Sequence, residues 1–185
     1  MKQSMRIGLI VGVVVISMAV IGCASLPLFG PKAPTKAVAV LRPLQGSTIQ
    51  GTVSFIQEGS GVRVIADLSG LTPGKHGIHI HEFGDCTAAD GSSLGGHYNP
   101  GNTMHAGPED KERHVGDLGN IEADKTGKAK YNRLDQQISL NGRNSIIGRS
   151  IVIKEKADDY KTQPGGAAGM RIACGVIGIS SLESN

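Results

Sequence analysis

Histidine is the residue type in this chain whose placement points most directly to chemistry. All six histidines lie between positions 76 and 114, and none follows. Imidazole is the commonest metal-ligating side chain near neutral pH. Five of the rings, with one carboxylate close behind them, therefore predict a metal site. These candidates are His79, His81, His97, His105, His114 and Asp117.

The first two of these rings lie on a predicted strand. Successive side chains of a strand point to opposite faces, so His79 and His81 share one face at roughly 6–7 Å, while Ile78 and Ile80 face the core. Two rings so placed can converge on one ion. The alternative is a pair of exposed polar residues on a half-buried strand. His76 falls on the opposite face, and we interpret it as a structural residue.

The elements that must position these rings are short strands. Gly-rich turns separate eight candidate strands, and we therefore predict an all-β sandwich or barrel. Two long segments, 84–116 and 156–170, do not fit strands, and loops of this length in a compact domain are usually functional or disordered. The predicted strands are 37–40, 52–56, 62–68, 75–83, 117–123, 128–134, 150–153 and 171–179.

Several motifs closely resemble the copper/zinc superoxide dismutase family. They are G-I-H-I-H-E-F-G-D-C, L-G-G-H-Y-N-P, M-H-A-G-P and E-R-H-V-G-D-L-G-N. Downstream the resemblance resumes at G-R-S-I-V-I-K-E-K-A-D-D-Y and ends at M-R-I-A-C-G-V-I-G-I. It implies an eight-stranded antiparallel Greek-key sandwich or barrel with two long functional loops. It also implies conversion of superoxide to oxygen and hydrogen peroxide at a copper and zinc site.

The resemblance assigns a role to each candidate. His97 would bridge the two ions and supply a proton, and Arg171 would attract and orient the superoxide anion. Asp158 would hold a copper-ligating and a zinc-ligating ring together. The alternatives are that Asp158 is an exposed acid in a loop and that Arg171 is a surface arginine without a role in the site. The implied ligands are His79, His81 and His97 for copper, and His97, His105, His114 and Asp117 for zinc.

Lys154 departs from the family pattern, which has a copper-ligating histidine at this position. No histidine after His114 can replace it. An ammonium cannot bind a metal, and bringing its pKa from about 10.4 to 7 would cost about 4.6 kcal/mol. We therefore expect a complete zinc site and impaired copper binding. Dismutase activity is the favoured function; the alternative is a catalytically inactive, zinc-stabilised binding or structural lipoprotein on the same fold.

The N-terminus predicts export. Lys2 and Arg6 precede an apolar stretch that ends at Gly22, as in a secretory signal. The sequence V-I-G-C resembles a bacterial lipoprotein box, with Cys23 as the lipidated residue that anchors the protein to a bacterial membrane. A membrane-spanning helix is the alternative, but about 15 apolar residues are short for it. The predicted divisions are a lipoprotein signal peptide (1–22), a tether (23–36) and the dismutase-like domain (37–185).

The cysteines and the net charge agree with an exported protein. The chain has three cysteines, and the resemblance implies a disulfide between Cys86 and Cys174, which leaves Cys23 for the lipid. Two free thiols are the alternative, but an oxidising compartment preserves such a bond. The net charge is +3, and no basic aromatic surface indicates nucleic-acid binding. The expected partners are superoxide and a membrane, and a homodimer is a possible assembly.

Overall fold

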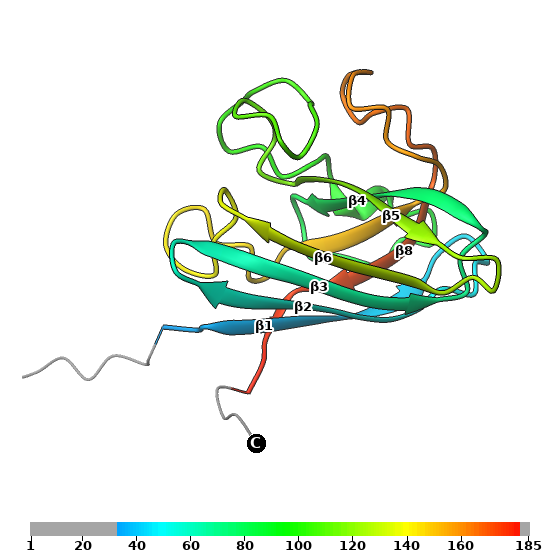
Figure 1. The fold of residues 1–185 in the computed structure, drawn as a ribbon, viewed down its shortest axis with the longest axis horizontal. Helices are drawn as coiled ribbons and strands as arrows, with labels where there is room; N and C mark the ends of the chain where they lie inside the picture. Colours follow the sequence, from blue (N-terminus) through cyan, green and yellow to red (C-terminus); the bar gives the residue numbers. More distant parts are fainter. Residues whose placement is uncertain (1–32, 182–185) are drawn as a thin grey trace, which may run out of the picture. The chain divides into compact units, whose positions relative to one another are not determined.

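The strands close on themselves as an antiparallel barrel in the computed structural model, which describes residues 33–181 (Figure 1). Within that range no helix is long and apolar enough to cross a membrane. The predicted signal peptide, Cys23 and most of the predicted tether lie outside the described residues. The described elements are β1 Lys36–Pro43, β2 Gln50–Glu58, β3 Gly61–Ser69, β4 Gly74–His81, the 3-10 helix η1 Ser92–Leu94, β5 Asp117–Ala123, β6 Ala129–Asp135, β7 Ser150–Lys154, β8 Arg171–Val176 and β9 Gly178–Ile179.

Two crossovers give the barrel its Greek-key topology. Around the barrel the strands follow the order β2-β3-β6-β5-β4-β7-β8-β1, and β1 returns to pair with β2. The connections from β3 to β4 and from β6 to β7 therefore pass over other strands. The predicted all-β, eight-stranded Greek-key barrel is confirmed.

The last predicted strand, 171–179, differs from the prediction because it is interrupted at Ile177. The backbone N–H of Ile177 donates to Arg149 O at 2.8 Å, and its carbonyl accepts from Gly148 N at 2.9 Å. These bonds draw the backbone at this position toward the segment before β7. The chain resumes strand pairing with β1 in the short β9.

Alternation of side chains along the strands builds the core. In β1 the inward positions Ala37, Ala39 and Leu41 are buried, and the residues between them are more exposed. Phe55 of β2 and Ile80 of β4 are fully buried in the same cluster. Apolar burial of this kind supplies most of the stabilising free energy of a fold, so the barrel is a rigid platform for the loops that join its strands.

The two predicted long loops are present and extend from the same end of the barrel (Figure 1). They span 82–116 and 155–170 and are joined by Gln163, whose side-chain amide accepts from His105 N and donates to His105 O, both at 2.8 Å. The first loop is also tied to the barrel by Arg113, which forms a buried ion pair with Asp135 of β6 at 2.5 Å.

Candidate metal site

The predicted rings meet under the two long loops. His79 and His81 extend from β4 and are almost completely buried, while Ile78 and Ile80 point into the barrel core. The other three rings come from loop 82–116, and Asp117 is the first residue of β5. The succession of β4, loop 82–116 and β5 thus brings the rings of the strand and the rings of the loop together at one point.

Four of the side chains form one compact group, described by the contacts of Asp117. Its Oδ1 lies 2.8 Å from His97 Nδ1, 3.0 Å from His105 Nδ1 and 3.2 Å from His114 Nδ1. All four potential ligand atoms lie within 4.8 Å of one another. Burial raises the pKa of Asp117, but the three ring contacts outweigh it and hold this pKa far below the ordinary value. The carboxylate therefore stays ionised and available to a cation.

A second group consists of His79, His81 and His97, whose ligand atoms also lie within 4.8 Å of one another. The rings of His79 and His97 stack at 4.0 Å between centroids. Burial lowers the pKa of His79 and that of His81, and it lowers the pKa of His97 to about 4 against the opposing effect of Asp117. Neutral rings carry the lone pairs that metal binding requires.

Unpaired ring nitrogens indicate that both groups fit a metal ion. His79 Nδ1, His81 Nε2, His105 Nδ1 and His114 Nδ1 are buried without a hydrogen-bond partner among the described residues. The last two lie near Asp117 but lack hydrogen-bond geometry. Buried polar atoms are normally satisfied, and four exceptions directed into two clusters are explained by lone pairs reserved for cations.

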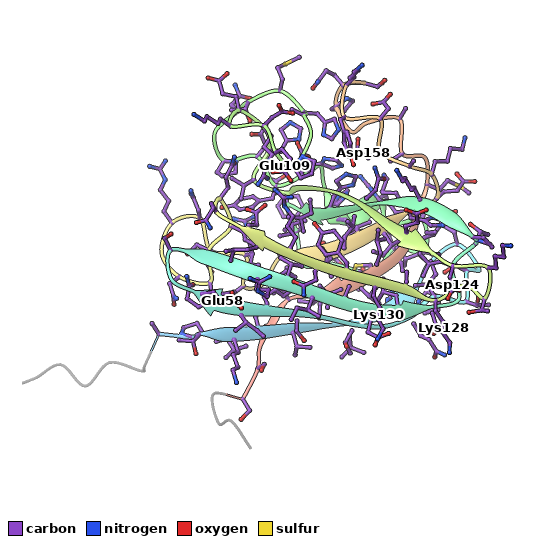
Figure 2. The ribbon with its side chains drawn as sticks, viewed as in Figure 1. Glu58, Glu109, Asp124, Lys128, Lys130 and Asp158 are labelled. Carbon is purple, nitrogen blue, oxygen red and sulfur yellow. A yellow bond between two sulfur atoms is a disulfide. The ribbon has the colours of Figure 1, made fainter. Side chains whose placement is uncertain are left out.

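Asp158, which Figure 2 labels at the end of the barrel where the long loops lie, joins the two groups. Its Oδ2 accepts from His79 Nε2 at 2.7 Å and its Oδ1 from His105 Nε2 at 2.9 Å. The backbone of Asp158 is fixed by Asn120, whose Oδ1 accepts from Asp158 N at 2.7 Å and whose Nδ2 donates to Asp158 O at 3.0 Å. A side chain at Gly166 would collide with the carboxylate. Nothing in the residue pattern indicates the roles of Asn120 and Gly166 separately.

Lys154 and Arg171 are register partners on β7 and β8 and line one cavity of about 290 Å³ with His81 and His97. The guanidinium of Arg171 donates to Gly91 O at 2.6 Å and Gly95 O at 2.7 Å. These two carbonyls, which sequence reasoning did not anticipate, fix the arginine at the wall.

The environment of Lys154 changes the cost of its neutral form. The residue is only 9% exposed. Burial, followed by the charge of Arg171, lowers the pKa of Lys154 to about 8, although Asp158 acts in the opposite direction. Neutralising the amine at pH 7 therefore costs about 1.4 kcal/mol. The cost of about 4.6 kcal/mol expected from the ordinary pKa was too high, because it neglected desolvation.

Three further predicted residues, His76 and the two cysteines Cys86 and Cys174, occupy definite places. His76 is buried, with Nδ1 2.9 Å from Lys154 O and Nε2 2.8 Å from Thr72 O. It therefore fastens the end of β7, consistent with a structural role. Cys86 of the first long loop and Cys174 of β8 form a disulfide across a sequence separation of 88.

Together these features define a class of protein: a Greek-key β-barrel that holds a two-centre histidine site beneath two loops. The family model described as copper/zinc superoxide dismutase (SODC) matches residues 49–177. A curated relative is the "Superoxide dismutase [Cu-Zn]" of Paramecium bursaria Chlorella virus 1, which is 49% identical over 152 residues, or 78% of this chain and 80% of the relative. This chain belongs to the copper/zinc superoxide dismutase family.

A solved structure supports the same fold. The structure titled "Crystal Structure Analysis of the clock protein EA4" is 44% identical to this chain, with a TM-score of 0.76. The match covers 82% of this chain and 98% of that one. The barrel and its loops are therefore shared over nearly the whole length of that neighbour.

Proposed function

We propose that this protein converts superoxide to oxygen and hydrogen peroxide, with zinc bound tightly and copper bound more weakly than in a site with four imidazoles. The observation that carries the proposal is the convergence of two groups of buried ring nitrogens, four of which have no hydrogen-bond partner among residues 33–181. Family membership implies both metals and is consistent with superoxide as the substrate.

Zinc would be held by His97, His105, His114 and Asp117. Four protein ligands with no open position suit a structural zinc, which favours closed tetrahedral coordination. Three of the four belong to loop 82–116, and the fourth, Asp117, is the first residue of β5. Because such a site does not exist in the unfolded chain, zinc binding would contribute directly to the order of the loop.

Copper would be held by His79, His81 and His97, and it would supply the one-electron redox chemistry. Lys154 stands beside this group with a charge that opposes a metal cation. Three imidazoles can still bind copper, but a changed ligand set alters both affinity and redox potential. This is why we propose impaired copper binding.

The chain's own residues would bind the substrate and supply the proton. Arg171 is a permanent cation fixed at the cavity wall, and fixed charges in a cleft increase the rate at which small anions enter. The Nδ1 of His97 faces Asp117, so Nε2 lies on the other side of the ring. A proton held at Nε2 would be donated to the reduced oxygen species.

The second candidate function is a zinc-stabilised binding or structural lipoprotein without dismutase activity. Lys154 favours it, because a cation replaces the fourth copper ligand. The fixed Arg171 and the bridging Asp158 favour the enzyme, because a zinc-only protein has no need of an anion-attracting group beside the second histidine cluster.

Export and assembly are also part of the proposal. The signal-like segment and Cys23 support a lipid-anchored protein exported to a bacterial membrane, on the periplasmic or cell-surface side. A homodimer is supported by apolar side chains exposed on the paired strands β1, β8 and β9: Val40 is 69% exposed, Val176 46% and Ile179 61%.

The decisive experiment compares metal content with dismutase rate in the full chain. We expect one zinc per chain after loading and a dismutase rate that appears only with added copper. Asp117→Ala should abolish stoichiometric zinc binding, whereas Asp159→Ala, an exposed acid near the site, should not. Absence of zinc from the loaded parent would contradict the four-ligand assignment. If the protein shows no dismutase activity even after copper is added, the binding lipoprotein is favoured.

A further inference from the structure

The side chain of Lys154 is buried, yet it faces a cavity. It lines the space of about 290 Å³ that is also lined by His81 and His97. Its Nζ makes no hydrogen bond or ion pair with any residue in the range 33–181. A charge that is buried without a partner is costly, so the surroundings disfavour the ammonium form of this side chain.

The neutral form of Lys154 is a nucleophile. Burial, followed by the charge of Arg171, lowers the pKa of Lys154 to about 8, so roughly one amine in ten is neutral at pH 7. Desolvated lysines beside another cation serve proteins as nucleophiles toward carbonyl carbons. Dissolved carbon dioxide offers such a carbon. Because this molecule is small and uncharged, it enters a buried space without the desolvation cost of an ion.

Arg171 is a cation placed beside the product of such a reaction. Lys154 and Arg171 are register partners on β7 and β8, and directly opposed residues of paired strands have Cβ atoms about 5 Å apart. A guanidinium has five N–H groups, and the bonds to Gly91 O and Gly95 O use only part of them. Bonds between a guanidinium and a carboxylate are about twice as strong as neutral ones. Arg171 can therefore hold an anionic group formed on Lys154.

The cavity also has room for the added atoms. Its lining includes Gly96 and Gly165 and contains no carboxylate. A Cβ at Gly165 would lie 3.3 Å from His97 Nε2, so the missing side chain leaves this nitrogen open. No acid at the wall of the cavity competes for the amine of Lys154 or repels an anion formed on it.

We propose that Lys154 is a site of reversible carbamylation by dissolved carbon dioxide, and that Arg171 holds the resulting carbamate. The neutral Nζ attacks the carbon of carbon dioxide, and one N–C bond forms. The electron pair of one C–O π bond moves to an oxygen, which becomes anionic, and Nζ releases one proton to the buffer. Nothing is oxidised or reduced. The side chain changes from a cation to an anion with two oxygen donors.

Carbamylation changes what the second histidine cluster offers to copper. This consequence rests on the proposed function, in which Lys154 occupies the position of a copper ligand. The impaired copper binding proposed above belongs to the free amine. The carbamate removes the opposing charge and adds oxygen donors, and nitrogen and oxygen ligands together suit Cu(II). The fraction of carbamylated chains would therefore set the copper affinity of the protein.

The direct test is carbon-13 NMR of the zinc-loaded, copper-free full chain near neutral pH, with labelled bicarbonate as the source of carbon dioxide. We expect one carbamate resonance per chain, which disappears when carbon dioxide is purged. Lys154→Arg keeps the positive charge but has no amine, so it should abolish this resonance. Lys156→Met, which changes an exposed lysine two residues away, should retain it.

Chemical trapping locates the modification in the parent and does not depend on the folding of any variant. Alkylation of the carbamate oxygen, followed by peptide mass spectrometry, should place the adduct on Lys154. Absence of a carbamate from the parent, or an adduct on other lysines alone, would overturn the proposal.

Copper affinity gives a second readout. In chelator competition, bicarbonate should tighten copper binding by the parent at least about tenfold, the factor lost to the charge of Lys154 at pH 7. It should leave Lys154→His unchanged, and an equal effect on both proteins would contradict a carbamate ligand. A carbamate on Lys154 in a protein that is inactive with copper would support the modification and refute the enzyme. An active protein without the carbamate would refute the modification alone.

Discussion

Replacing Lys154 by histidine should restore the copper half of the site. The side chain lies at the end of β7, beside His81 and His97 in the cavity. Lys154→His removes a positive charge and adds an imidazole, and both changes favour copper. Lys154→Ala separates the two causes, because it removes the charge without adding a ligand, and it should recover only part of the affinity.

The expected gain in copper affinity follows from the pKa of Lys154, which is lowered to about 8. Below that pH the amine is protonated, so at pH 7 removing the charge that opposes copper costs about 1.4 kcal/mol, or tenfold in affinity. At pH 9 this cost disappears. The rings of His79 and His81 have lowered pKa values and that of His97 is about 4, so they do not compete for protons in this range. The advantage of Lys154→His at pH 7 should therefore be at least about tenfold and should shrink by about tenfold at pH 9.

The assay is a competition titration of zinc-loaded protein with a chromophoric copper chelator at both pH values, alongside the dismutase rate. The alanine variant should show no such pH dependence. If the parent already binds copper tightly at pH 7 and turns over superoxide as fast as Lys154→His, the reasoning about a damaged site is wrong. A parent affinity that is flat between pH 7 and pH 9 would show that the charge of Lys154 does not oppose copper binding.

Three further predictions concern the supports of the site. Asp158→Asn should weaken metal binding about 10–100-fold, measured by chelator competition, because it disturbs both rings that the carboxylate holds. Arg113→Met should lower the free energy of unfolding of the metal-free protein by about 1–3 kcal/mol in urea, because it removes the shorter ion pair of the buried Asp135 and leaves only Arg133 at 3.5 Å; an unchanged midpoint would contradict this role. Replacing Cys86 and Cys174 by serine should cost about 4 kcal/mol in the same assay, since the bond closes a loop across 88 positions.

The barrel was predictable because its strands alternate. Buried Ala37 and Ala39 in β1, and Ile78 and Ile80 beside the paired histidines, follow the two-residue period of a strand. The interruption at Ile177 was not predictable. It depends on hydrogen bonds to Gly148 and Arg149, which are distant in sequence, and a local apolar pattern contains no information about such bonds.

The candidate site also contains residues that were predictable from the sequence and residues that were not. The histidine motifs identified the rings that meet under the loops, because the family resemblance encodes their order in the chain. The supports were missed: Asn120 clamps the backbone of Asp158, and Gln163 joins the two loops. Amide side chains are common in loops, and nothing in their type or spacing distinguishes a clamp from an exposed residue. The lowered pKa of Lys154 was likewise not predictable, because it depends on how deeply the folded chain buries the amine.

The seam that closes the barrel has a consequence for biogenesis. β1 pairs with β2 beside it in sequence, and its other edge pairs with the distant β8 and β9, with Arg42 opposite Cys174 and Ala37 opposite Ile179. Contacts between such distant segments slow folding, and until they form, β1 presents an open edge that another chain can pair with. A nascent or C-terminally truncated chain is therefore an aggregation hazard, and quality-control chaperones would encounter it with that edge exposed.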